Sequence, residues 1–177
     1  MAKETHEEPY RRGMVVVAHP DDAEYGCSGT VAKWCRDGME VVYIIVTDGS
    51  KGTSAREVTP IELSEMRRQE QAAAGKVLGL KDVVFLCHPD AYLEPTLEVR
   101  RDIAREIRRY RPDILITTSP VRSFSGNAYL GHPDHFATGE ATLSAVYPAA
   151  RDHLTFPELL KEGLEPHKVR EVLITGH

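Results

Sequence analysis

Five short apolar runs, rich in β-branched residues, recur along the chain. They cover Met14–Ala18, Val41–Thr47, Val83–Leu86, Ile114–Thr118 and Val172–Thr175. The runs are apolar throughout and do not alternate with polar residues, which is typical of strands that are covered on both faces of a sheet. The pattern therefore predicts a sheet of five buried strands.

Segments between these runs place apolar residues at helical spacing and predict three amphipathic helices. Asp37–Gly38, Gly79 and Pro112 follow these segments as helix-ending signals. Because strands and helices alternate, the sequence predicts an α/β fold, a single domain with an open, mainly parallel sheet and helices on both faces. The three apolar stripes consist of Val31, Trp34 and Cys35; of Leu63, Met66, Ala73, Ala74, Val77 and Leu78; and of Val99, Ile103, Ile107 and Tyr110.

Length and charge limit the class of protein. The chain has 177 residues and a formal net charge of −5, which suits one globular domain and disfavours a general binder of nucleic acid or anionic membranes. Six arginines lie within Arg100–Arg111, and we expect them to form mostly a solvated helix face. No apolar run approaches the roughly 18 residues of a membrane-spanning helix. The start has no secretion signal and the three cysteines have no CxxC spacing, so a cytoplasmic protein with reduced thiols is expected.

The first cluster of chemically active residues is "HPDDAE", directly after the first predicted strand. Parallel sheets place their functional sites at the carboxyl ends of strands. His19 and Asp22 are three residues apart on this turn, so their side chains can converge on one metal ion, while Asp21 points elsewhere. A carboxylate beside a metal site is the arrangement that a general base needs. The alternative is that Asp21 or Asp22 only caps the helix that follows.

The second cluster is "GHPDH", which follows the fourth predicted strand after a long loop. His132 and His135 are three residues apart at the start of a predicted helix, so they share one helix face. One of them can complete a His-Asp-His set with His19 and Asp22, as in catalytic zinc sites with three protein ligands. The other histidine then stays free to donate a hydrogen bond or a proton.

Together, "AHPDDAEYGCSGT" and "GHPDH" resemble the PIG-L/LmbE-like zinc deacetylases. "TDGSKGT" (Thr47–Thr53) and "RRQEQAAAGKVLGL" (Arg67–Leu80) are similar to the family's loop after strand two and to the helix that follows it. The resemblance runs from about Met14 to His135. It implies a Rossmann-like domain without a dinucleotide, and hydrolysis of N-acetyl groups from amino sugars and related amides.

The resemblance also implies roles for individual residues. His19, Asp22 and His135 would be the ligands of one zinc ion, with iron(II) as an alternative metal. Asp21 would be the general base that activates a water molecule, and His132 would stabilise the oxyanion or protonate the departing amine.

Further residues are expected around this centre. Glu70 interrupts an apolar stripe three residues after Arg67, which predicts a partly buried pair, with Arg67 also the better candidate for a substrate contact; a structural salt bridge is the alternative. Glu24 is expected to hold a histidine ligand or the loop backbone, or else to be a charge at a helix N-terminus. The predicted substrate contacts are Arg67, Asp90, Asn127 and Tyr129, and the predicted supporting residues are Glu24, Glu70 and Asp134.

The sequence thus predicts an enzyme that removes the acetyl group from an N-acetylglucosamine-type sugar or conjugate. Its partners would be that small molecule and, through self-association, further copies of the chain, with no nucleic acid and no membrane. Residues 1–12 are expected to form an N-terminal arm, and the C-terminal extension usual in the resembled family is expected to be absent. The alternatives are another metal-dependent hydrolase, such as a phosphoesterase, and a non-catalytic Rossmann-like metal-binding module.

Overall fold

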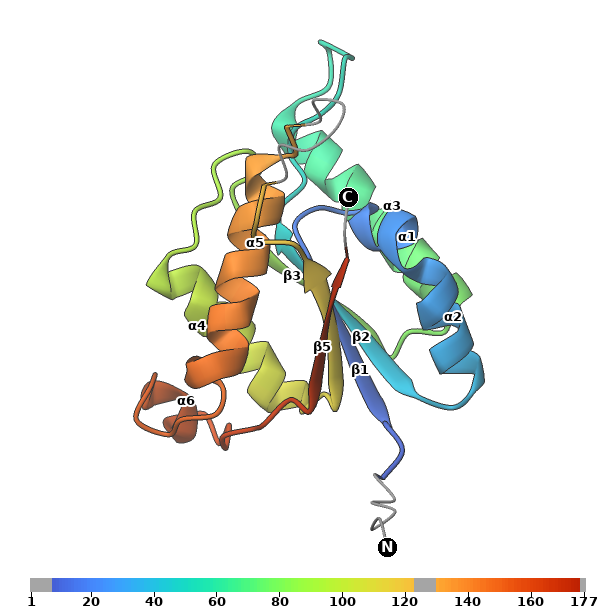
Figure 1. The fold of residues 1–177 in the computed structure, drawn as a ribbon. Helices are drawn as coiled ribbons and strands as arrows, with labels where there is room; N and C mark the ends of the chain where they lie inside the picture. The colour runs from blue at the N-terminus through green and yellow to red at the C-terminus, as the bar shows by residue number, and fades with distance from the viewer. Residues whose placement is uncertain (1–7, 123–129, 176–177) are drawn as a thin grey trace, which may run out of the picture.

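A five-stranded parallel sheet forms the centre of the molecule (Figure 1). The computed structural model describes residues 8–122 and 130–175. The strands are β1 (Arg12–Val17), β2 (Glu40–Thr47), β3 (Asp82–His88), β4 (Ile114–Thr118) and β5 (Glu171–Thr175), in the spatial order β3-β2-β1-β4-β5. Each predicted strand is present, and the parallel α/β fold is confirmed. The expected burial is wrong for β5, an edge strand in which Leu173 and Ile174 are 36% and 45% exposed.

Helices cover both faces of the sheet, as Figure 1 shows. One face carries α1 (Asp22–Gly26), α2 (Ser28–Arg36) and α3 (Pro60–Leu78), and the other carries α4 (Leu97–Tyr110) and α5 (Pro133–Ser144). A short π-helical segment η1 (Ala145–Ala149) and α6 (Glu158–Lys161) precede β5. Side chains that alternate along β1 enter the two separate cores: Val15 and Val17 pack on the α2 side, while Met14 and Val16 pack on the α4 side.

The direction of winding changes between β1 and β4. From β1 the chain builds β2 and β3 on one side, and it then crosses to build β4 and β5 on the other. In open parallel sheets the carboxyl ends of the two strands at such a reversal border a crevice, which is where ligands bind. The motif "HPDD" follows β1, and the motif "GHPDH" follows β4.

Helix α3 ends at Gly79, as the sequence predicts, but its buried face differs from the predicted stripe. Thr59 and Glu62 form a reciprocal capping box at its start, and Gly79 ends it with φ 77°. The predicted apolar stripe is confirmed at Leu63, which is buried, but it is wrong at Met66 and Val77, which are 49% and 88% exposed. The helix buries two residues outside that stripe, Gln71 and Gly75.

The predicted N-terminal arm is attached to the domain over its described part. The Tyr10 hydroxyl donates to Glu171 Oε2 (2.6 Å), and the backbone amides of Arg11 and Arg12 donate to Asp113 Oδ2 (2.8 and 2.9 Å). Arg12 is already the first residue of β1. Among residues 8–122 and 130–175, no helix is both long and apolar enough to span a bilayer.

Candidate metal centre and active site

The turn after β1 holds its two potential ligands through a local hydrogen bond. The His19 amide donates to Asp22 Oδ2 (2.8 Å), which draws the aspartate back toward the histidine. Between them, Asp21 adopts φ 83°, in the left-handed region that costs most L-residues roughly 1–2 kcal/mol. This conformation lets Asp21 and Asp22, though adjacent in sequence, send their carboxylates in different directions.

The second motif lies at the start of α5, with His132 as the N-cap residue and Pro133 in the first turn. The Thr118 hydroxyl at the end of β4 donates to the backbone carbonyl of His135 (2.7 Å). Gly139 lies against the same strand end, where an added Cβ would be 2.4 Å from Thr118 O. These contacts seat the helix directly on β4 and bring His135 toward the turn after β1.

His19, Asp22 and His135 converge on a common point. His19 Nδ1 lies 3.3 Å from His135 Nε2 and 3.4 Å from Asp22 Oδ2, and His135 Nε2 lies 3.1 Å from Asp22 Oδ1. In a tetrahedral site with bonds of about 2.0–2.1 Å, neighbouring ligand atoms lie roughly 3.3–3.4 Å apart. The two histidine nitrogens therefore have the spacing of two corners of a zinc-sized tetrahedron, and the Asp22 carboxylate presents one oxygen to each of them. Two imidazoles with one carboxylate are a donor set that zinc prefers.

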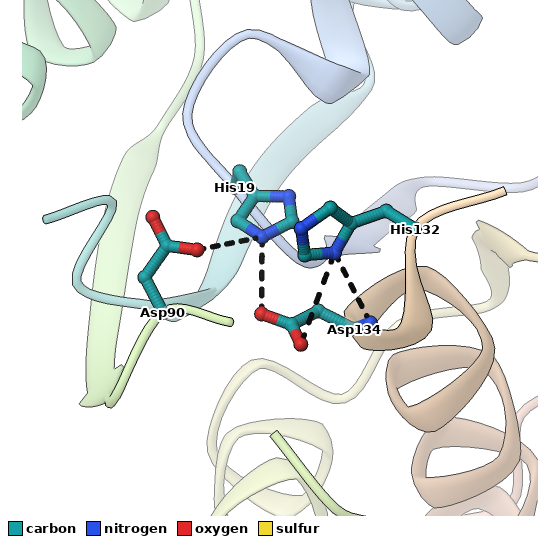
Figure 2. Close-up of side chains that lie close together, drawn as sticks. All are labelled: His19, Asp90, His132 and Asp134. Carbon is teal, nitrogen blue, oxygen red and sulfur yellow. Dashed lines mark hydrogen bonds and ion pairs between the residues drawn. The ribbon is translucent and has the colours of Figure 1, made fainter. Parts of the chain in front are cut away.

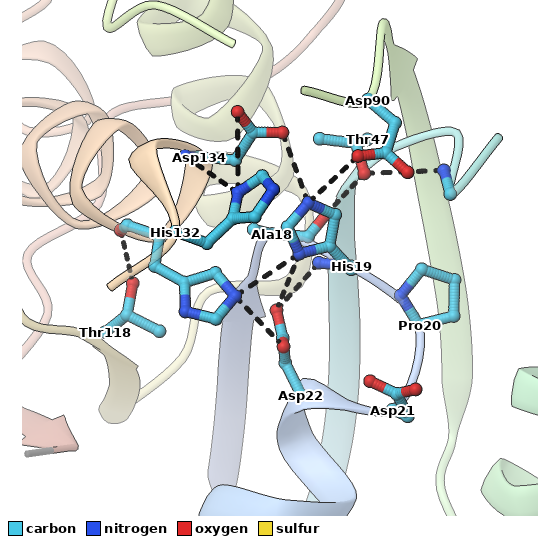
Figure 3. Close-up of polar contacts among 12 residues, drawn as sticks. Ala18, His19, Pro20, Asp21, Asp22, Thr47, Asp90, Thr118, His132 and Asp134 are labelled. Carbon is cyan, nitrogen blue, oxygen red and sulfur yellow. Dashed lines mark hydrogen bonds and ion pairs between the residues drawn. The ribbon is translucent and has the colours of Figure 1, made fainter. Parts of the chain in front are cut away.

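The opposite edge of His19 faces two buried carboxylates (Figure 2). His19 Nε2 lies 3.1 Å from Asp134 Oδ2 and 3.2 Å from Asp90 Oδ1. Figure 3 shows the ring between this pair and Asp22. A proton on Nε2 satisfies the two carboxylates and leaves the lone pair of Nδ1 facing Asp22 and His135, as a metal ligand requires.

The electrostatics of this centre favour a positive charge. Burial alone would lower the pKa of His19, but hydrogen bonds with Asp134, Asp22 and Asp90 outweigh it and raise the pKa to about 11. Burial likewise opposes ionisation of Asp22, yet His135 and His19 hold the pKa of its carboxyl below the usual range. The same negative field that holds a proton there suits a cation.

His132 lies beside this centre and is half-exposed, with 39% of its side chain accessible. Its ring packs edge-on against His19, with 4.7 Å between the ring centroids. Its Nδ1 accepts a hydrogen bond from the Asp134 amide (3.2 Å), so in the neutral ring the proton is on Nε2. Burial lowers the pKa of His132, which favours this neutral form.

A second group, His19, Asp90, His132 and Asp134, also lies close enough to hold an ion. Its donor atoms are already engaged, however. Asp134 accepts from the amides of Ala91 (2.8 Å) and Leu93 (3.3 Å), and His132 Nδ1 accepts from Asp134. The group of His19, Asp22 and His135 is therefore the better metal site.

Asp21 lies outside both groups, on the same turn as Asp22 (Figure 3). Its side chain is 60% exposed, and Oδ2 accepts from Arg67 at 3.0 Å. The expected Arg67–Glu70 pair is therefore replaced by an Arg67–Asp21 pair. Glu70 itself is exposed and lines a cavity of about 130 Å³ beside Asp21.

Some residues take places that the sequence did not indicate. Asp90, a predicted substrate contact, has a side chain only 4% exposed, and its Oδ2 accepts from the Lys51 amide (3.0 Å). The structure thus places it behind His19, beside the supporting residue Asp134. The two other predicted contacts in the loop before the second motif, Asn127 and Tyr129, lie outside the described residues.

Two residues near the centre are absent from the sequence-based prediction. Thr118 holds the backbone of His135, and Gln71 is a helix residue only 3% exposed. Gln71 Oε1 accepts from the Asp21 amide (2.9 Å), and its Nε2 donates to Glu24 Oε1 (2.9 Å). Glu24 therefore reaches the loop backbone through Gln71. The one available signal was a polar residue four positions after Arg67 in a helix that faces the site.

Comparisons with known proteins bear on the family of the chain. The family model of the GlcNAc-PI de-N-acetylases (PIG-L) matches residues 14–146. The chain is similar to a diacetylchitobiose deacetylase of Thermococcus kodakarensis, with 35% identity over 162 residues that cover 92% of this chain and 58% of that protein. It is also similar to a 1D-myo-inositol 2-acetamido-2-deoxy-alpha-D-glucopyranoside deacetylase of Kineococcus radiotolerans, with 33% identity over 173 residues that cover 80% and 46% of the two chains.

Among solved structures, the fold matches the N,N'-diacetylchitobiose deacetylase of Pyrococcus horikoshii in complex with an inhibitor. The TM-score is 0.83 at 30% sequence identity, over 90% of this chain and 57% of that one. The chain thus spans about half to three fifths of the length of these relatives. Its match to the family model covers both histidine motifs and all of the sheet except β5. The chain belongs to the PIG-L family of de-N-acetylases.

Proposed function

We propose that the protein is a zinc-dependent hydrolase that removes the acetyl group from an N-acetylglucosamine-type sugar or conjugate. The observation that carries this proposal is the convergence of His19, Asp22 and His135 on a common point, with Asp21 and His132 at its edge. Three of the groups suit a metal ion. Neither Asp21 nor His132 is needed to hold one, so both remain available for the reaction.

Hydrolysis of an acetamide needs a base, a stabilised carbonyl oxygen and a proton for the amine. A zinc ion held by His19, Asp22 and His135 would lower the pKa of a water molecule and would polarise the carbonyl group of the substrate. Asp21 accepts the proton of the attacking water, because its carboxylate is exposed and Arg67 fixes one of its oxygens. The water oxygen bonds to the carbonyl carbon, the carbon–nitrogen bond breaks, and acetate and a free amine leave.

His132 provides the donor for the other side of the reaction. With Nδ1 occupied by the Asp134 amide, its Nε2–H is the free donor of the ring. That group donates a hydrogen bond to the developing oxyanion, for which the neutral form of His132 is sufficient. The proton that Asp21 takes from the water passes to the departing amine.

The class of substrate is inferred from the relatives. They are deacetylases of diacetylchitobiose and of an inositol-linked acetamido sugar, which share an N-acetylglucosamine-type unit. We propose that this chain acts on the same unit. Arg67, Asn127 and Tyr129 stay predictions as contacts to the rest of the substrate.

Acetate release from a panel of N-acetylated sugars, with zinc-loaded protein, tests the proposal. N-acetylglucosamine, diacetylchitobiose and inositol-linked N-acetylglucosamine form the panel. We expect Asp21→Ala to lower kcat by about 10²–10⁴-fold, the range of general-base catalysis, while zinc content stays at the wild-type level. Asp37→Ala, at an exposed carboxylate paired with Lys33, is the matched control and is expected to leave kcat unchanged.

Two results would contradict the proposal. Undiminished turnover by Asp21→Ala would remove Asp21 as the base. Phosphate release from a phosphomonoester, without acetate release from any sugar of the panel, would assign the centre to another class of hydrolase.

A further inference from the structure

Gln71 is a polar side chain buried under the turn that carries Asp21. It is 3% exposed, and both ends of its amide bind that turn or the helix that follows it. Oε1 accepts from the Asp21 backbone amide, and Nε2 donates to Glu24 Oε1, each at 2.9 Å. A buried amide in the middle of a helix stabilises the fold only when it is hydrogen-bonded, so its two partners indicate what it does.

Arg67, one helical turn before Gln71, binds the same peptide unit from the other side. Its guanidinium donates to Pro20 O at 2.7 Å, and this carbonyl belongs to the peptide bond whose N–H is bound by Gln71. The two side chains of α3 therefore hold both the oxygen and the N–H of the Pro20–Asp21 peptide. A peptide unit held at both ends cannot rotate about its axis without losing two hydrogen bonds.

The orientation of this peptide sets the backbone conformation of Asp21. A flip of the peptide would change φ of Asp21, which is 83° and therefore unfavourable for a residue with a Cβ. The contacts from Arg67 and Gln71 oppose that flip. We infer that Gln71 is a positioning residue that keeps Asp21 in its left-handed conformation and thereby aims its carboxylate at the substrate; this rests on the proposed role of Asp21 as the base.

Glu24 determines which end of the Gln71 amide meets Asp21. An ionised carboxylate only accepts hydrogen bonds, so Glu24 requires the NH₂ end of the amide and leaves Oε1 for the Asp21 N–H. Glu24, Gln71 and Asp21 thus form a directed chain of hydrogen bonds, in which Glu24 acts on the base through Gln71.

Kinetics on the zinc-loaded protein test this role. Gln71→Leu is expected to lower kcat by about tenfold or more with KM changed less than about twofold, because an unpaired Asp21 amide releases the turn. Gln69→Leu is the matched control, since Gln69 is exposed on the same helix and its side-chain amide donates to Glu65 of that helix. Equal kcat values for the two variants would overturn the inference.

A double-mutant cycle separates positioning of Asp21 from a general loss of structure. If Gln71 acts through Asp21, then Gln71→Leu causes no further loss in an Asp21→Ala background. A loss of the same size in both backgrounds would overturn the inference, because it would place the effect elsewhere.

An exchange of the two partners tests the direction of the chain. Gln71→Glu alone places two carboxylates together and is expected to lower kcat as much as Gln71→Leu does. Adding Glu24→Gln restores one donor and one acceptor, since the amide introduced on α1 then donates to the carboxylate introduced on α3, which still accepts from the Asp21 amide. We expect the double variant to recover to within about threefold of wild type; a double variant no better than Gln71→Glu would contradict the assigned order.

Hydrogen exchange gives a measure that needs neither activity nor metal. In Gln71→Leu, the Asp21 amide is expected to exchange at least about tenfold faster than in Gln69→Leu, while amides of the α3 backbone keep their rates. Equal Asp21 rates would overturn the inference on structural grounds. If the wild-type protein releases no acetate, but the Asp21 amide still exchanges faster in Gln71→Leu than in Gln69→Leu, the proposed function is overturned and the positioning of Asp21 by Gln71 stands.

Discussion

The two nitrogens of His19 do different work. Nε2 faces Asp90 and Asp134, and these carboxylates are in turn held by the backbone amides of Lys51, Ala91 and Leu93. A rigid backbone therefore fixes the proton of His19 on one side of the ring. The proton on the other nitrogen is the one that a metal ion displaces, and the lone pair that this leaves points toward Asp22 and His135.

Asp134 is the more completely held of these two carboxylates, and its loss should weaken the metal site. Asp134→Asn removes the charge that retains the proton on His19 Nε2, and we expect zinc affinity to fall about 10–100-fold. Competition with a chromophoric zinc chelator measures this change. Asp37→Asn changes an exposed aspartate paired with Lys33 and should leave the zinc affinity unchanged. Equal zinc affinities for the two variants would show that Asp134 does not affect metal binding through His19.

The residues that the sequence identified and those it missed differ in how they meet. His19 and Asp22 lie on one turn, and their spacing alone indicates a shared ion. Gln71 contacts Asp21 and Glu24, which lie 50 and 47 positions away. No local pattern encodes such a contact, because a buried polar residue on a helix is identified only by the partner that satisfies it.

At the scale of secondary-structure elements, the close packing of α5 against β4 determines where His132 and His135 lie. Both His132 and His135 lie at the start of this helix, so any movement of its axis moves the two side chains together. Only glycine fits at position 139 of this helix, because a Cβ there would also be 2.9 Å from Pro120 N. The absence of a side chain thus sets the distance between helix and strand.

Gly139→Ala should therefore disturb the site through the helix that carries it. The methyl group must push α5 away from the Thr118 carbonyl, and we expect a destabilisation of about 1–3 kcal/mol together with weaker zinc binding. Gly29→Ala is the matched control, since this helical glycine has nothing within 4 Å of its Cβ position. Denaturant unfolding measures the free energy of unfolding of both variants. If Gly139→Ala is as stable as Gly29→Ala, the close packing of α5 on β4 is contradicted.

Sequence patterns predicted whole elements better than their faces. The five apolar runs were sufficient for the sheet. The central strands β1, β2 and β4 are covered on both sides and have almost no polar positions to confuse the pattern, and the less buried β3 and β5 are apolar as well. The stripe of α3 was misassigned, since Met66 and Val77 are exposed while Gln71 and Gly75 are buried. Apolar periodicity cannot show that a helix turns a polar side chain toward a site.

At the scale of the whole molecule, Arg108 joins parts of the chain that are distant in sequence. It was expected on a solvated face, yet it is 2% exposed and donates to the carbonyls of Ala149 (2.8 Å), Asp152 (2.8 Å) and Thr155 (3.0 Å). Burial lowers the pKa of Arg108, but a guanidinium stays charged in proteins. One side chain therefore holds the segment between η1 and α6 against α4.

Replacing Arg108 should lower global stability without touching the site. Arg108→Met keeps much of the length but removes the hydrogen bonds to three carbonyls, and we expect a loss of about 2–4 kcal/mol in the free energy of unfolding. Arg36→Met, at an exposed arginine of α2, should change it by less than about 0.5 kcal/mol. Chemical denaturation checks both values, and similar midpoints would show that the buried contacts contribute little.

The reversal of winding between β1 and β4 has a consequence for folding as well as for chemistry. His19 and Asp22 follow one of these strands and His135 follows the other, so these three side chains come together only when both halves of the sheet have assembled. The unfolded chain offers no comparable site, and a metal that binds only the native state stabilises it by mass action. The ion would then act as a reversible cross-link between the two halves, and the persistence of the fold would depend on how much free metal surrounds the protein.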